Sequence, residues 1–195
     1  MRVETKTVTY YTLAELKEAH PNGYERALDM LRVSQWDGGW PRDDVAECIE
    51  QEFTMRVAIS GDHVHGIELK GWAVQDRGAY VGFEGTLTPE NSPALPWHEY
   101  LEQVDLRAGR SYTEISIRDS EDAPYLGYRG IPAEGNAEHA ALIDARASMQ
   151  TAVEDALSEA LATGEKQAEY LDSEENLLEQ AQANEWEFTE HGSWA

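Results

Sequence analysis

Hydrophobic residues in the N-terminal part of the chain recur every three or four positions, the spacing of amphipathic helices. Residues 1–11, rich in valine, threonine and tyrosine, favour a strand before the first helix. Thr12 and Glu15 have the spacing of a capping box, so we expect a helix to begin at Leu13. The turn residues of "HPNG" should interrupt it, and helical spacing resumes at Tyr24.

A further helix is expected after the turn-rich connector "SQWDGGWP", because Pro41 suits a first helical turn. Its apolar stripe consists of Val45, Cys48, Ile49 and Phe53. Cys48 is therefore interpreted as core packing. It is the only cysteine in the chain, so the sequence excludes an intrachain disulfide and a zinc site built from several cysteines.

From Met55 to Leu87 the hydrophobic period shortens toward two, which indicates strands. "MRVAIS" is a short strand candidate, and "HGIELKGWAV" with "GAYVGFEGTL" predicts an antiparallel hairpin joined at "QDRG". The glycines of this hairpin lie in a strand pattern with no helix after them, so they do not resemble a phosphate-binding loop. Trp72 and Tyr80 are expected on the face opposite Leu69 and Val81, where they form a candidate contact patch.

Beyond the hairpin, "PWHEYLEQV" resembles a short helix, "RSYTEISIRD" alternates as a strand does, and "APYLGYRGIP" suggests an irregular segment. These elements predict an α+β fold, an antiparallel sheet packed by N-terminal helices.

The last third of the chain changes to helical periodicity. A long amphipathic helix is predicted from Asn136 to Thr163, a break at Gly164, and a second helix that packs back to form a hairpin. The sequence therefore suggests an α+β domain over residues 1–133 and an acidic helical hairpin over residues 134–195, packed on the same domain.

Composition adds a strong electrostatic constraint. The chain has 195 residues, 38 acidic and 15 basic side chains and a formal charge of -23. This charge disfavours direct binding to nucleic acid or to anionic membranes, and it favours basic protein partners, including proteins that bind nucleic acid. No run approaches the length of a membrane span and the polar start lacks a signal sequence, so a cytoplasmic protein is expected.

The negative charge is concentrated in the helical third, where residues 134–195 carry 2 basic and 15 acidic side chains, a net charge of -13. A subset is spaced to share one face of a helix: Glu165, Glu169, Asp172, Glu175 and Glu179. One interpretation is a solvated face that aids solubility. The alternative is a partner-binding stripe that imitates phosphate, favoured because almost no cation is interspersed to offset the repulsion.

The chain offers no specific catalytic constellation. "DHVH" places His63 and His65 at a spacing that two metal ligands could use, but a third ligand is not identifiable among Asp62, Glu68 and His98. Its serines lie outside a hydrolase motif. We therefore predict no catalytic residue, metal or cofactor, and a homo-oligomer is compatible with the sequence.

Five motifs carry a resemblance that spans most of the chain in order: "YTLAEL", "SQWDGGW", "GWAVQDRGAYVGFEG", "GRSYTEISI" and "NEWEFTEHG". The sequence resembles a family of small accessory proteins encoded by bacteriophages and mobile elements, some loosely labelled antitoxin-like. At the hairpin it departs from that family, with "LKGW" and "QDRGA" in place of a Phe-Ser-Gly-Phe run and a turn of glutamine, glycine and aspartate. The resemblance implies a phage protein acting inside a bacterial host.

These observations lead to three hypotheses. The first is a non-enzymatic phage inhibitor that binds a host nucleic-acid-handling or defence protein through an acidic, DNA-mimicking surface. The second is an antitoxin-like or regulatory module that binds one protein through the apolar faces of its C-terminal helices, including Leu157 and Leu178. The third is a metal-dependent enzyme using His63 and His65.

Overall fold

The first helix begins where the capping box predicts. We describe a computed structural model of the protein at residues 8–37, 40–58, 64, 66–74, 79–98, 101, 103–109, 112–116 and 137–195. Strand β1 (Tyr10–Thr12) leads directly into helix α1 (Leu13–Ala19). The amide of Glu15 donates to Oγ1 of Thr12 at 3.3 Å, and the amide of Thr12 donates to Oε2 of Glu15 at 2.8 Å. Both bonds satisfy backbone donors that the start of a helix leaves without partners.

Helix α2 (Pro21–Asp37) follows α1 after the single residue His20. A break between two helices is thus confirmed, but its predicted place at Pro21 to Gly23 is wrong, because these residues form the first turn of α2 and only His20 lies between the helices. Proline is accommodated there because that turn has no carbonyl partner for its missing amide hydrogen.

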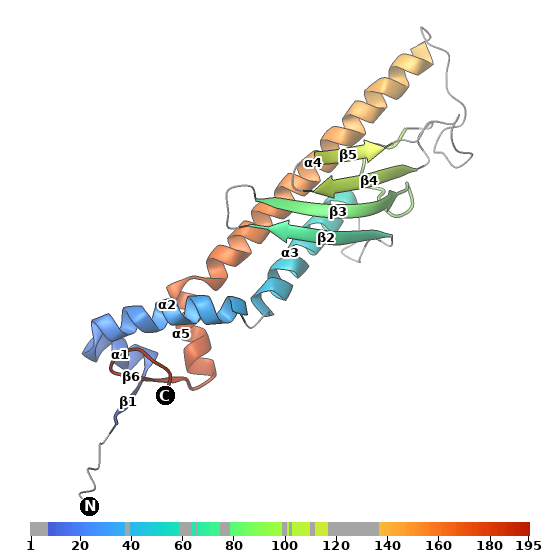
Figure 1. Cartoon of the computed structure of the whole chain (residues 1–195). Helices are drawn as coiled ribbons and strands as arrows, with labels where there is room; N and C mark the ends of the chain where they lie inside the picture. The colour runs from blue at the N-terminus through green and yellow to red at the C-terminus, as the bar shows by residue number, and fades with distance from the viewer. Residues whose placement is uncertain are drawn as a thin grey trace, which may run out of the picture. The chain divides into compact units, whose positions relative to one another are not determined.

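The chain forms two compact units, of which the first combines the two ends of the sequence, Met1–Asp44 and Gln167–Ala195. It contains α1, α2, helix α5 (Glu174–Ala183) and an antiparallel pair of β1 with strand β6 (Glu187–Thr189) (Figure 1). Its core is formed by residues of α1, α2, α5 and β6, and Tyr11 of β1 is partly buried against it. The buried residues are Leu13, Leu16, Tyr24, Ala27, Leu28, Leu31, Leu177, Ala181 and Phe188.

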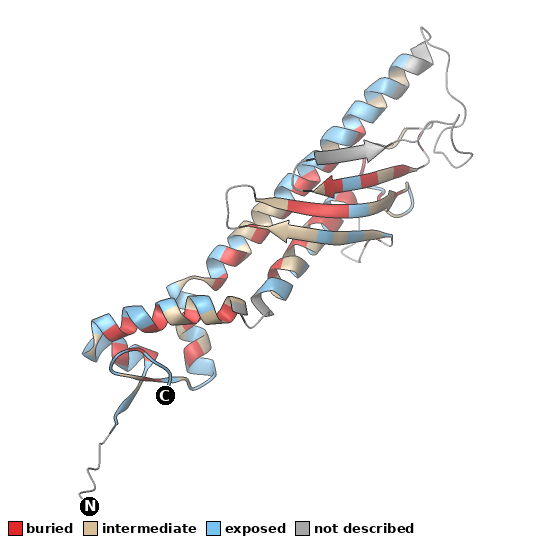
Figure 2. Ribbon diagram, viewed as in Figure 1, coloured by how far each residue is buried: buried red, intermediate tan, exposed pale blue. Residues whose placement is uncertain are grey.

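The second unit, Val45–Lys166, is built around a four-stranded antiparallel sheet in the order β2-β3-β4-β5. The strands are β2 (Ile67–Ala73), β3 (Tyr80–Leu87), β4 (Val104–Gly109) and β5 (Tyr112–Ser116). Most of helix α3 (Trp40–Val57) and of helix α4 (Ala137–Leu171) belongs to this unit. The predicted α+β class and the β2–β3 hairpin are therefore confirmed. Figure 2 shows buried residues concentrated in β3 and β4, whereas exposed residues cover much of α4.

Helix α3 packs on the sheet through the ring of Phe53, which stacks on Phe83 with centroids 4.2 Å apart. The buried positions Val45, Ile49, Phe53 and Val57 follow one another at intervals of four. That spacing continues the helix through Val57, and Ala58 lies in a bend, so the strand predicted for "MRVAIS" is wrong at residues 55–58. Residues 59 and 60 lie outside the described part of the chain.

Strand β4 was not predicted, and the helix expected over "PWHEYLEQV" is absent from its described residues. Val104, Leu106 and Ala108 are buried and alternate with polar residues, as in a strand with one covered face. The predicted strand in "RSYTEISIRD" is confirmed as β5, with Ile115 opposite Leu106 in the register. The "QDRG" connection and the "APYLGYRGIP" segment lie outside the described residues.

The break predicted at Gly164 is also wrong, because α4 continues through that residue to Leu171. A Cβ atom at position 164 would lie 2.7 Å from Cγ1 of Ile49 and 3.2 Å from Cγ1 of Val74. The glycine therefore allows α3 and α4 to approach closely instead of ending the helix. The chain passes from one compact unit to the other within α3, between Asp44 and Val45, and within α4, between Lys166 and Gln167. Neither boundary coincides with the one predicted at residue 133.

Helix α5 ends in a Schellman motif whose left-handed residue is a glutamate. The amide of Trp186 donates to the carbonyl of Ala181 at 2.9 Å, and the amide of Glu185 donates to the carbonyl of Gln182 at 3.2 Å. Glu185 has a φ of 54°, a conformation in which glycine is preferred.

Within the described residues, no helix combines the length and the apolar composition needed to cross a membrane.

Gly164→Ala should lower the free energy of unfolding. Alanine normally stabilises a helix interior by about 1 kcal/mol relative to glycine. Here the added methyl group must displace the fully buried Ile49 side chain, and overpacking of this kind costs about 1 to 3 kcal/mol. Urea unfolding tests the sign of this change in the free energy of unfolding. In a protein that already carries Ile49→Ala, the contact is gone, so adding Gly164→Ala should raise the free energy of unfolding. If Gly164→Ala alone raised the free energy of unfolding, the contact with Ile49 would not restrict the residue at position 164.

Glu185→Gly should instead raise the free energy of unfolding by about 1 kcal/mol, because glycine adopts the left-handed conformation without a Cβ penalty. The neighbouring Asn184 is the control, since its φ is -97° and glycine has no advantage there. Urea unfolding of Asn184→Gly should give a loss. Equal effects of the two substitutions would contradict the conformational explanation.

Candidate functional site

The five carboxylates predicted to share one helical face are distributed over two helices and a turn. Glu165 and Glu169 lie on α4, Asp172 lies in the turn after it, and Glu175 and Glu179 lie on α5. Because α4 ends at Leu171, the predicted continuous stripe does not form. Glu165 belongs to the second compact unit, whereas the other four residues belong to the first.

Asp172 uses its carboxylate within the protein. Its Oδ1 atom accepts hydrogen bonds from Nε2 of Gln35 at 2.6 Å and from Nε1 of Trp36 at 2.9 Å. Nε of Arg32 also donates to the backbone carbonyl of Asp172 at 3.3 Å. Asp172 therefore links the end of α2 to the turn before α5 by hydrogen bonds. Its spacing in the sequence did not predict this structural role.

Glu174, which sequence analysis did not single out, is also bound internally. Its Oε1 atom accepts hydrogen bonds from Nζ of Lys17 at 2.5 Å and from the hydroxyl of Tyr24 at 2.6 Å. The bond from Lys17, and after it the bond from Tyr24, lowers the pKa of Glu174 below its ordinary value. Burial of the Tyr24 ring, followed by its bond to Glu174, raises the pKa of Tyr24 above its usual range. The position of Glu174 immediately after the N-cap Ser173 was the only sequence signal for a constrained carboxylate.

Other carboxylates in this part of the first unit are exposed and lack such partners. We call the following set the open carboxylates: Glu169, Glu175, Glu179, Glu185 and Glu187. Among the described residues, none of them forms an ion pair or a side-chain hydrogen bond. The sequence from 167 to 195 contains eight acidic residues and neither lysine nor arginine, and the nearest basic residue before this segment is Lys166, three residues before Glu169.

Three of the open carboxylates were predicted from their helical spacing, whereas Glu185 and Glu187 were not predicted. Both belong to "NEWEFTEHG", where acidic residues alternate with Trp186 and Phe188. This alternation is the signal of a half-buried strand, and Phe188 is fully buried while Glu187 is exposed.

The predicted patch of Trp72 and Tyr80 does not form on one face of the hairpin. Trp72 lies opposite Val81, whereas Tyr80 lies opposite Ala73, and directly opposed residues of antiparallel strands share a face. A register shift between Leu69 and Gly71 brings Trp72 to the Val81 face and leaves Tyr80 on the other. The Tyr80 hydroxyl lies 3.3 Å from where a Cβ of Gly71 would stand, so this glycine makes room for the tyrosine.

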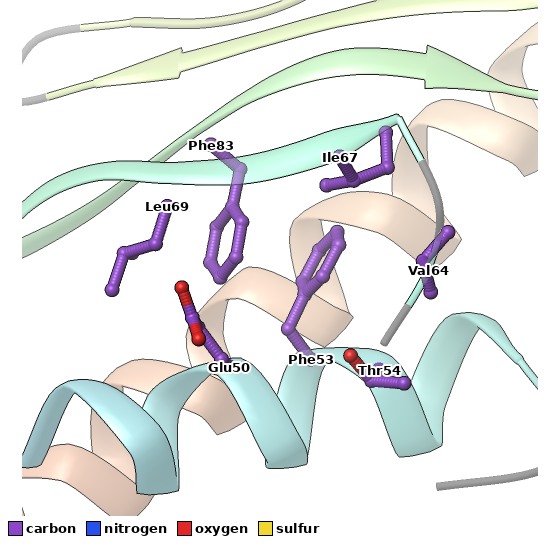
Figure 3. A pocket seen from close by; sticks show the side chains of 7 residues that line it. All are labelled: Glu50, Phe53, Thr54, Val64, Ile67, Leu69 and Phe83. Atoms are coloured by element: carbon purple, nitrogen blue, oxygen red, sulfur yellow. The ribbon is translucent and has the colours of Figure 1, made fainter. Parts of the chain in front are cut away.

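A small cavity between α3 and the hairpin is part of the core of the second unit. Figure 3 shows it between Phe53 and Thr54 of α3 and Leu69 and Phe83 of the sheet, with Glu50 nearby. Its volume is about 30 Å³, which is about the volume that one molecule takes up in liquid water. It is too small for a cofactor or an organic substrate.

The histidines considered as metal ligands, His63 and His65, lie outside the described residues. Within the part of the chain that the structure does describe, no three histidine, cysteine, aspartate or glutamate side chains are gathered as a metal site requires.

The bonded Glu174 should make the stability of the protein depend on acidic pH. Because its pKa is lowered in the folded state, its contribution is present above the ordinary value of 4.5 and is lost as the pH falls through the folded-state pKa. The free energy of unfolding should therefore fall more steeply from about pH 6 to about pH 3 in the native protein than in Glu174→Gln. Glu175→Gln is the matched control for the loss of one carboxylate from the same helical turn. If the free energy of unfolding of Glu174→Gln depended on pH as steeply as that of the native protein, the stabilising role of the Glu174 carboxylate would be contradicted.

Comparison with known proteins gives no relative from which a site could be transferred. The chain matched no protein-family model, no curated protein and no solved structure. The candidate site therefore rests on the open carboxylates and on the contacts that hold their surroundings in place.

Proposed function

We propose that the protein is a non-enzymatic inhibitor, encoded by a bacteriophage or mobile element, that binds a basic protein of the bacterial host cytoplasm. The target is a nucleic-acid-handling or defence protein, and the open carboxylates occupy the cationic surface that otherwise binds phosphate. The observation that carries this proposal is the group of five exposed carboxylates without a cationic partner, in a region where residues 167–195 contain no lysine or arginine.

The electrostatic cost of this arrangement supports an external partner. Glu175 and Glu179 are separated by four residues on α5, a spacing at which like charges cost about 0.2 to 0.5 kcal/mol in an isolated helix. The fold offsets the charge of Glu174 with Lys17 but leaves these two exposed. A basic partner would relieve this repulsion by placing cations beside the carboxylates.

Contacts and exposure guide the choice of residues in this proposal. We leave Asp172 out because its carboxylate already accepts hydrogen bonds from Gln35 and Trp36. Glu185 and Glu187 are added because they are exposed and belong to the same acidic segment. Trp72 and Tyr80 no longer support a joint contact patch, since they lie on opposite faces of the hairpin.

A second candidate is an antitoxin-like or regulatory module that binds its partner through apolar helix faces. Leu178 favours it, because this residue is only partly buried at the edge of the first core. Leu157 does not favour it, because only 6% of the residue is exposed and it belongs to the core of the second unit. An interface of this kind would be insensitive to salt, in contrast to one made by the open carboxylates.

Neutralising three open carboxylates should reduce capture of the host partner by about tenfold at moderate ionic strength. The variant is Glu169→Gln, Glu175→Gln and Glu179→Gln, used as bait in a bacterial lysate. The matched control removes three exposed charges from α4 in the other unit: Asp144→Asn, Glu154→Gln and Asp155→Asn. The control should capture the same partner at the native level, although both variants have the same net charge.

Two further measurements test whether the partner binds through a cationic, phosphate-binding surface. Capture by the native protein should decrease steeply with added salt, and duplex DNA or RNA should displace the captured protein. Capture that persists at high salt and is unaffected by nucleic acid would contradict phosphate imitation and support the apolar interface. Equal losses in the two triple variants would show that only net charge matters.

A further inference from the structure

A groove of about 630 Å³ lies in the first unit, between the start of α1 and the exposed side of α5. Its apolar lining comes from Leu13 and Ala14 of α1 and from Leu178 and Ala181 of α5. Its acidic lining comes from Glu185 and Glu187, which are both exposed. The groove thus combines an apolar floor with a negative rim.

The elements around the groove suit a helix as the occupant. Two helices contribute its apolar lining, and side chains of a third helix at intervals of three and four residues can fill the space between two helices. Ala14 is small and exposed, so a neighbouring backbone can approach α1 closely at this point. Leu178 is partly buried and offers a side chain for an apolar contact.

The charges around the groove determine what kind of helix fits. Glu175 and Glu179 lie three residues before Leu178 and Gln182 respectively, so they are neighbours of groove residues on the surface of α5. The nearby cation Lys17 is already paired with Glu174. A second copy of this chain would bring another formal charge of -23, so a self-association through this rim is opposed by repulsion.

Glu185 provides an additional reason to assign a function to the rim. It occupies the left-handed position of the Schellman motif, where glycine would be more stable. Residues held in sparsely populated backbone conformations cluster at functional sites such as ligand-binding sites. A carboxylate at the rim of a binding groove is a physical explanation for glutamate at this position.

We infer that this groove binds an amphipathic helix of the partner protein, with apolar residues facing Leu178 and Ala14 and with lysine or arginine residues facing Glu185 and Glu187. The inference rests on the proposed function, because it names the segment by which a basic partner is held. The open carboxylates then flank the helix, and the apolar floor fixes its position.

Synthetic peptides test the inference without the natural partner. The probe is a helical peptide of about 18 residues, long enough to form a helix, with leucines on one face and lysines beside them. One control replaces the lysines with glutamine, and another has the same composition in a scrambled order without an apolar face. The full chain should bind the amphipathic lysine peptide at least about tenfold more tightly than either control, measured by fluorescence anisotropy.

Substitutions in the groove locate the binding site. Ala14→Arg places a long cationic side chain in the groove and should weaken binding of the lysine peptide by about tenfold or more. Ala19→Arg is the matched control, because it makes the same change at an exposed α1 residue outside the groove lining, and it should bind as the native protein does. Glu185→Gly should weaken binding several-fold while it raises the midpoint of urea unfolding, which separates loss of binding from loss of folding.

The outcomes distinguish this inference from the proposed function. Equal binding of the scrambled and amphipathic peptides, or equal effects of Ala14→Arg and Ala19→Arg, would overturn the groove assignment. The proposed function would survive that result if neutralising the open carboxylates still abolished salt-sensitive capture of the host protein. Conversely, tight binding of the lysine peptide together with salt-insensitive capture would support the groove and contradict phosphate imitation.

Discussion

The contact between the two ends of the chain is the constraint on which the acidic region depends. Glu174 accepts hydrogen bonds from Lys17 and Tyr24, and Asp172 accepts them from Gln35 and Trp36, across sequence separations of 136 to 157 residues. Closing such a long loop costs conformational entropy, which the buried core of the first unit must offset. Leu177, Ala181 and Phe188 supply the C-terminal part of that core.

This contact separates two groups of carboxylates in the C-terminal segment, while Glu190 lies beside His191 and belongs to neither. Those at the start of α5 are held by donors from α1 and α2, and they position the helix. The open carboxylates are left exposed on the elements that the first group holds in place. The proposed partner surface is therefore supported by ordered helices, which reduces the entropy that binding must otherwise overcome.

In the two proposals, the groove supplies the specificity that a negative charge distribution lacks, since charge alone would attract any basic protein. Long-range attraction accelerates association, but it does not fix one orientation. An apolar floor made by α1 and α5 beside Glu185 and Glu187 could fix the position of a bound helix, because apolar contacts depend on close fit. In the two proposals, the partner is thus recognised by the open carboxylates, whose attraction weakens with added salt, and by the neighbouring apolar floor of the groove, whose contacts do not.

The sequence by itself determined the α+β class, the capping box at Thr12, the β2–β3 hairpin and the acidic character of the last third, because each depends on residues close together in the chain. Only the tertiary structure decided that Gly164 lies within a helix, since its reason is a contact with Ile49. It also decided that Trp72 and Tyr80 face opposite sides, through a local shift in strand pairing that alternation does not reveal. The separation of Asp172 from the open carboxylates likewise depends on donors that lie far away in the sequence and close in space.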